Sequence, residues 1–80
     1  MSFMFEVYYE APPDAAREER LTNEVARFGG CLDFRELPDK HCPSVVLTYE
    51  FQDLESAEVA ASHIQQLGEY VEGPVLYGDD

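Results

Sequence analysis

Four side chains of this chain are soft metal ligands, namely Cys31, His41, Cys42 and His63. Their spacings match none of the patterns of structural zinc sites. Cys31 begins an extended segment and Cys42 lies in the turn beyond it, so about 20 Å or more separates them at about 3.3 Å per residue, which rules out a disulfide. We expect a packed Cys31, a turn thiol at Cys42 and no bound metal, with a His41–Cys42 metal site across a dimer as the alternative.

Glu6 and Glu50 are the carboxylates whose positions suggest chemistry. Each lies within an alternating, strand-like segment, and the alternation places both on the same side of a sheet. Because two neighbouring carboxylates repel, we expect a cation such as Arg35, or uptake of a proton, to offset the repulsion. Unshifted NMR titrations of both groups would contradict this hypothesis, and with it the weaker one that they form an acid and base couple.

Known motifs of catalysis and cofactor binding do not occur in the sequence. It has no Gly-x-Ser-x-Gly, no His-Glu-x-x-His, no phosphate-binding loop and no calcium-binding loop. Segment 10–14 contains two prolines, which lack backbone donors, and acidic side chains, which repel phosphate. We therefore expect a protein that is not an enzyme and holds no cofactor.

Four extended segments are expected to form strands. Positions 3–10 alternate between apolar and mixed residues, and similar strands are predicted at 31–37, 44–51 and 70–77. A turn rich in breakers, at 38–43, joins the second and third strands into a hairpin. Pro74 within the last segment predicts that this strand lies at a sheet edge.

Two helices are expected between the strands. The first follows Pro12 and Pro13 and ends at Gly29, and the second begins at an Asp53 N-cap and ends at Gly68. Apolar residues recur at helical spacing in both segments. In the first these are Leu21, Val25 and Phe28, and in the second Leu54, Ala57, Ala60, Ala61, Ile64 and Leu67, with His63 at the border of the stripe.

The order strand, helix, strand, strand, helix, strand predicts an α+β, ferredoxin-like βαββαβ fold. Residues 1–80 leave room for one such domain. Right-handed crossovers place the first and third strands in the centre of a four-stranded antiparallel sheet, with both helices on one face.

The sheet face without helices is the candidate binding surface. On the first strand Phe3, Phe5, Val7 and Tyr9 face the helices, and on the third Val45, Leu47, Tyr49 and Phe51 do so. The opposite face then carries Met4, Glu6, Tyr8, Val46, Thr48 and Glu50. Asp33 and Arg35 are expected on this face of the second strand, and either Tyr70 or Leu76 on the fourth.

Segment 47–58, LTYEFQDLESAE, resembles the third strand and second helix of RNA-recognition domains, whose element order is the same. When Phe51 is aligned with the last aromatic residue of that family's third-strand motif, Val46 and Thr48 occupy the base-stacking positions. Ser44 occupies the position of the motif's leading basic residue. The RNA-stacking residues of the family are therefore missing, and we expect no nucleic-acid binding.

The charge balance excludes further partners. Seventeen acidic and five basic residues give a formal net charge of −12. Such a chain repels nucleic-acid phosphates and anionic membrane surfaces. No apolar run is longer than three residues, far below the roughly 18 needed to cross a bilayer. We expect a cytoplasmic protein with reduced thiols.

These observations predict a non-enzymatic protein-association domain that acts through its open sheet face. The expected occupant is a second copy, forming a homodimer, or a basic protein partner. The alternative is a dimeric domain that senses a small ligand or a metal. A melting temperature that changes with protein concentration would favour association, whereas a ligand-induced shift would favour sensing.

The excess of negative charge predicts that salt stabilises the fold. Like charges on a small compact surface repel each other, and added ions screen this repulsion. We expect the melting temperature to rise as sodium chloride is added. A melting temperature that falls with salt would contradict this expectation.

Overall fold

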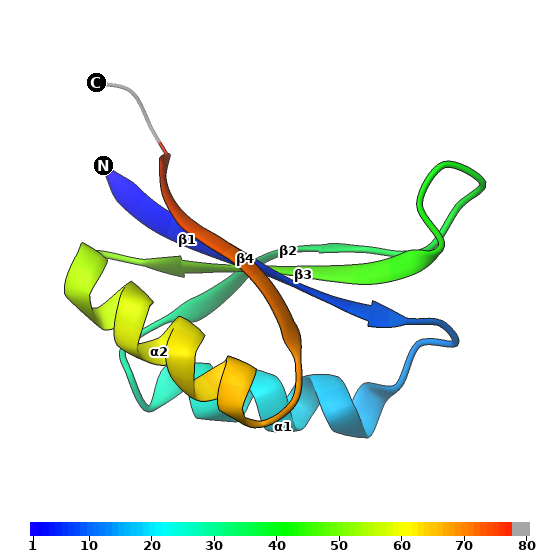
Figure 1. Ribbon diagram of the computed structural model, residues 1–80, viewed down its shortest axis with the longest axis horizontal. Helices are drawn as coiled ribbons and strands as arrows, with labels where there is room; N and C mark the ends of the chain where they lie inside the picture. Colours follow the sequence, from blue (N-terminus) through cyan, green and yellow to red (C-terminus); the bar gives the residue numbers. More distant parts are fainter. Residues whose placement is uncertain (78–80) are drawn as a thin grey trace.

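The computed structural model describes residues 1–77, which form one four-stranded sheet and two helices (Figure 1). The strands and helices, in chain order, are β1 (Ser2–Glu10), α1 (Ala15–Ala26), β2 (Cys31–Glu36), β3 (Ser44–Phe51), α2 (Leu54–Gln66) and β4 (Tyr70–Tyr77). Strand order in the sheet is β2-β3-β1-β4, and all three pairings are antiparallel. The predicted ferredoxin-like arrangement is confirmed, including central β1 and β3 and the edge position of β4, which contains Pro74.

Capping residues set the helix ends. Helix α1 follows Pro12 and Pro13 as predicted and begins after Asp14, whose carboxylate accepts a hydrogen bond from the Arg17 backbone N–H at 3.1 Å. Asp53 caps α2 as predicted, accepting from the Ser56 N–H at 2.9 Å. Such caps satisfy backbone donors that the first helical turn leaves free. Gly29 follows α1 with a φ of 90° that disfavours larger residues.

The core lies between the sheet and the helices, both of which cover one sheet face (Figure 1). The predicted alternation of β1 and β3 is confirmed, because Phe5, Val7 and Leu47 are fully buried. The central part of the predicted α2 stripe is buried too. The terminal members Leu54 and Leu67 are exposed, since they lie at the two ends of the helix, beyond the covering elements.

A β-bulge changes the orientation of β2. The register with β3 shifts between Leu32 and Phe34, so that Asp33 is an extra residue in the ladder. Such an insertion inverts the alternation beyond it. The prediction that Arg35 faces away from the helices is therefore wrong: Arg35 forms an ion pair with Glu18 of α1. Phe34, by contrast, lies on the face opposite the helices.

Candidate binding face

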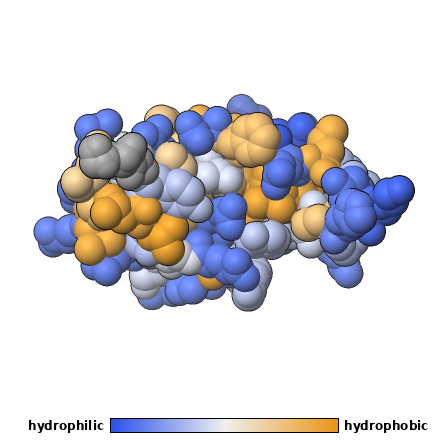
Figure 2. All heavy atoms as spheres, turned by 90° about the horizontal axis from the view of Figure 1, so that it is seen from above, coloured by the Kyte–Doolittle hydropathy of each residue, from blue (hydrophilic) through white to orange (hydrophobic). Residues whose placement is uncertain are grey.

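The open face is the sheet surface opposite the helices, and the strand register arranges most of its side chains in three rows, with Glu10 beyond the first of them. The first row crosses Glu36, Val46, Tyr8 and Tyr70; the second crosses Phe34, Thr48, Glu6 and Glu72; the third crosses Cys31, Glu50, Met4 and Val75. Figure 2, which views the molecule from above, shows hydrophobic groups in separate patches with hydrophilic side chains between them. The open face is thus a mixed surface rather than a continuous apolar one.

All six residues predicted for this face lie on it, at two different depths. Val46 and Thr48 are only 3% and 8% exposed, because they lie in the centre of the sheet beneath their neighbours. Met4, Tyr8 and the carboxylates Glu6 and Glu50 are half-buried. The half-buried residues are therefore the ones that a bound molecule could contact first. Val46 and Thr48 lie deeper, between them.

The outer strands add residues that the sequence did not assign. Phe34 is 56% exposed and reaches this face only because of the bulge in β2. Tyr70 is 59% exposed and pairs with Tyr8, which resolves the choice on β4 in favour of Tyr70, since Leu76 pairs with the core-facing Phe3. Only one feature of the sequence indicates the shifted register. Glu36 lies two residues after Phe34 and therefore on the same side of the strand.

Glu6 and Glu50 are diagonal neighbours and not directly opposed. Glu6 pairs with Thr48 and Glu50 pairs with Met4, which corresponds to roughly 7–8 Å between diagonal positions. The expected neutralisation by Arg35 does not occur, because that guanidinium is on the helix side. The carboxylate directly opposite Glu6 is Glu72 on β4.

Two tyrosines hold these opposed carboxylates in place. The Tyr8 hydroxyl donates to the Glu6 carboxylate at 2.9 Å, and the Tyr70 hydroxyl donates to Glu72 at 2.6 Å. The hydrogen bond to Glu6, together with burial, raises the pKa of Tyr8, and the bond to Glu72 raises the pKa of Tyr70. Both hydroxyls therefore stay protonated donors at neutral pH. The two rings meet edge to face, with centroids 5.8 Å apart.

Charge is distributed unevenly between the two faces. The open face carries five glutamates, Glu6, Glu10, Glu36, Glu50 and Glu72, and none of the four arginines. Three of those arginines form ion pairs on the helix side: Arg17 with Glu69, Arg27 with Glu24 and Arg35 with Glu18. Arg20 is exposed on α1. Within residues 1–77, the carboxylates of the open face therefore have no arginine or lysine partner.

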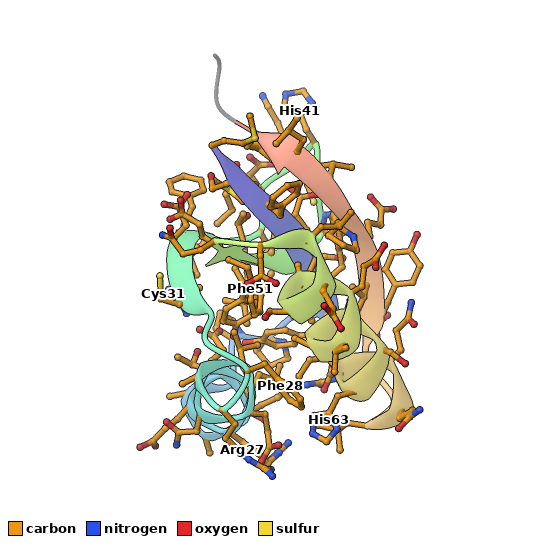
Figure 3. All side chains as sticks on the ribbon, turned by 90° about the vertical axis from the view of Figure 1, so that its left-hand side faces the viewer. Arg27, Phe28, Cys31, His41, Phe51 and His63 are labelled. Carbon is orange, nitrogen blue, oxygen red and sulfur yellow. The ribbon has the colours of Figure 1, made fainter. Side chains whose placement is uncertain are left out.

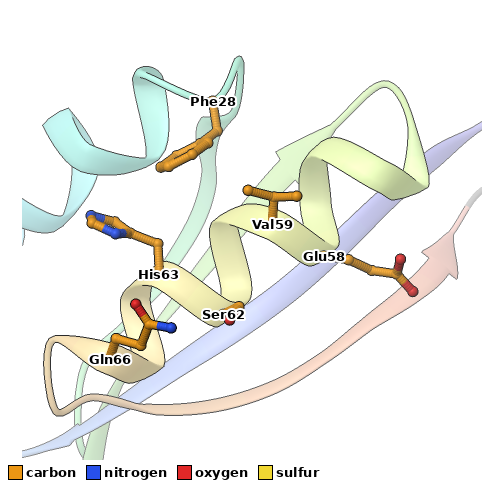
Figure 4. Close-up of a pocket in the computed structure, with 6 residues that line it drawn as sticks. All are labelled: Phe28, Glu58, Val59, Ser62, His63 and Gln66. Atoms are coloured by element: carbon orange, nitrogen blue, oxygen red, sulfur yellow. The ribbon is translucent and has the colours of Figure 1, made fainter.

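A second surface feature lies on the helix side. A hollow of about 420 Å³ is lined by Phe28, Glu58, Val59, Ser62, His63 and Gln66, and Figure 4 shows the Phe28 and His63 side chains next to each other at one side of it. The predicted border position of His63 is confirmed: the ring is half-buried, donates to Glu24 at 2.8 Å and packs against Phe28. That hydrogen bond lowers the pKa of Glu24. These contacts give His63 a structural role between α1 and α2.

The soft ligands are scattered. Figure 3 shows Cys31, His41 and His63 in three separate parts of the molecule. Cys31 is exposed at the start of β2, so the expectation that it is packed is wrong; as the first residue of an edge strand it has no covering element. Cys42 is a half-buried free thiol in the β2–β3 turn. In the described part of the chain, no three metal-binding side chains gather into a candidate site.

Comparisons with known proteins add nothing on function, so a functional proposal depends on the fold and on the geometry of the open face. Neither α1 nor α2 is long and apolar enough to cross a membrane, and residues 1–77 contain no other helix. The chain has no match among protein-family models, curated proteins or solved structures.

Proposed function

We propose that this chain is a non-enzymatic association domain that binds a basic protein segment through its open face. The observation that carries the proposal is the presence of five glutamates, without an arginine or lysine, on the described part of that face. Complementary charge steers partners together and selects among them. The exposed rings of Phe34 and Tyr70 supply the apolar contact area that such an interface also needs.

Charge also favours a basic partner over a second copy as the occupant. A twofold dimer through the open face would bring the same glutamates against each other, and like charges brought together at an interface are unfavourable. We expect the chain to be a monomer in sedimentation equilibrium at low and high salt. A stable dimer at both salts would overturn the proposed occupant and assign the face to self-association.

The proposed setting is the cytoplasm. Both cysteines are free thiols, as proteins of a reducing compartment usually have. Highly basic protein segments that bind nucleic acids or acidic proteins are candidate partners there by their chemistry.

The test is fluorescence anisotropy with a labelled peptide rich in arginine and lysine. We expect the double variant Glu36→Gln/Glu50→Gln to bind at least about threefold more weakly, since each exposed ion pair contributes up to about 1 kcal/mol. The matched control is Glu55→Gln/Glu58→Gln, which changes net charge equally on exposed α2. Equal weakening in both double variants would mean nonspecific attraction to an acidic protein and would overturn the proposal, as would no binding to the wild-type chain.

A further inference from the structure

The two tyrosines and two opposed glutamates of β1 and β4 form a more specific feature within the open face. We propose that Tyr8, Tyr70, Glu6 and Glu72, here named the ring-carboxylate site, receive one arginine side chain of the basic partner. This inference rests on the proposed function and names the side chain that the open face recognises. Its occupant is an arginine within a basic protein segment.

The opposed carboxylates are the first argument. Glu6 and Glu72 are direct cross-strand partners on adjacent strands, and like charges in such positions destabilise a sheet. Neither takes part in any of the ion pairs of residues 1–77. A cation bound between them would remove the repulsion, so the isolated chain keeps an unfavourable pair that a basic partner would stabilise.

The tyrosine rings are the second, independent argument. Tyr70 is 59% exposed, and its ring meets the Tyr8 ring at 65°, so ring surface remains open to solvent beside the carboxylates. A guanidinium binds favourably over such a surface by the cation–π interaction. Each hydroxyl fixes one carboxylate through a single hydrogen bond, and a carboxylate has further acceptor positions for a guanidinium.

The same chain already holds an arginine in this way. On the helix side, the Arg17 guanidinium lies 4.6 Å from the centre of the Tyr9 ring. Its Nε and Nη2 atoms donate to the two oxygens of Glu69 at 3.0 Å and 2.8 Å. A tyrosine face beside a glutamate therefore binds arginine within this fold. The ring-carboxylate site offers the same two groups in duplicate, without an arginine of its own, which favours arginine over lysine as the ligand.

The first experiment compares two labelled peptides of equal length and charge, one with arginine and one with lysine as its only basic residue type. We expect Tyr70→Leu and Glu72→Gln each to weaken binding of the arginine peptide by about 3- to 10-fold. We also expect them to reduce its preference over the lysine peptide. The matched controls are Tyr77→Leu, an exposed tyrosine on the same strand, and Glu58→Gln, an exposed glutamate on α2 outside the open face. An NMR spectrum of each variant is the check that it is folded.

The outcomes separate this inference from the proposed function. If Glu36→Gln/Glu50→Gln weakens peptide binding while Tyr70→Leu and Glu72→Gln match their controls, the ring-carboxylate site is wrong and the association role stands. Equal affinity of the wild-type chain for the two peptides would also refute arginine selection. If the wild-type chain binds neither peptide, both proposals fail.

A second measurement needs no peptide. Because Glu72→Gln removes one of two opposed charges and keeps an oxygen that accepts from Tyr70, we expect the melting temperature of the free variant to rise above that of the wild type and above that of Glu36→Gln, which removes the same charge elsewhere. If Glu72 served only to hold Tyr70 in place, exchanging its charged oxygen for the weaker amide acceptor would lower the melting temperature instead. A lower melting temperature for Glu72→Gln than for Glu36→Gln would contradict the inference.

Discussion

Replacing Gly30 with alanine is expected to lower the free energy of unfolding by about 1–3 kcal/mol, the usual effect of overfilling a packed core. Gly30 is buried between α1 and β2. A Cβ there would lie 2.3 Å from Cζ of Phe51 and 2.6 Å from Cγ1 of Val25. Both neighbours are buried at 1% exposure or less, so neither has free space to move into. Total stability for 80 residues is roughly 4–12 kcal/mol, and urea denaturation followed by circular dichroism measures the loss.

A second substitution isolates the steric cause. Gly29→Ala, one residue earlier, places its Cβ where no atom lies within 4 Å, although its φ of 90° still disfavours alanine. Phe51→Leu shortens the side chain with which the new Cβ of Gly30→Ala would clash. We expect Gly30→Ala to be less destabilising in the Phe51→Leu background, whereas Gly29→Ala should have the same effect in both backgrounds. Additive effects of Gly30→Ala and Phe51→Leu would show that the clash is not the cause.

Tyr9→Phe is expected to lower the free energy of unfolding by about 1.5–3 kcal/mol, as for other hydrogen bonds to charged groups. The Tyr9 hydroxyl is the centre of a polar cluster on the helix side. It donates to the Glu18 carboxylate and accepts from the Asp14 backbone N–H at 2.8 Å. Phenylalanine keeps the ring that Arg17 covers, so the variant removes the hydroxyl contacts and leaves the packing.

The Tyr9→Phe effect should depend on pH. Burial raises the pKa of Glu18, but hydrogen bonds from Arg35 and Tyr9 outweigh it, so this pKa is lowered overall, with Asp14 opposing. A group with a lowered folded-state pKa contributes stability above its unfolded value, about 4.3 for glutamate, and that contribution is lost as the pH falls through the folded value. We therefore expect a larger difference between wild type and Tyr9→Phe at pH 7 than at pH 3. The same difference at both pH values would mean that the charge on Glu18 does not strengthen its hydrogen bond with Tyr9.

The sequence predicted those parts of the fold that depend on local patterns. Alternation in β1 and β3 identified their buried faces, because each central strand has a helix layer on one side only. Asp53 and Gly29 marked helix ends through backbone rules that act within a few residues. Pro74 identified an edge strand because proline cannot donate to a second neighbour.

The open face was predicted only as far as the two central strands. One extra residue in β2, near Asp33, reverses which side chains face outward, and the sequence contains no glycine or proline there to mark the bulge. Arg35 was therefore assigned to the wrong side, and Phe34 was missed. On β4, an edge strand, most residues are exposed, so apolar and polar residues do not reveal the pairing of Glu72 with Glu6. That pairing depends on the register of β4 against β1 in the folded chain. The ring-carboxylate site depends on the same register, so the sequence did not predict it.

The bulge in β2 also affects how the domain behaves at high concentration. Sheet edges with regular, unbroken backbone can template the strands of other molecules and begin fibre growth. Here one edge is interrupted between Leu32 and Phe34, and the other by a register shift opposite Gly73 and Pro74. Both edges therefore resist the addition of a further strand, although they expose Phe34 and Val75. The same irregularity that turns Phe34 toward the open face therefore also disfavours strand addition at the β2 edge.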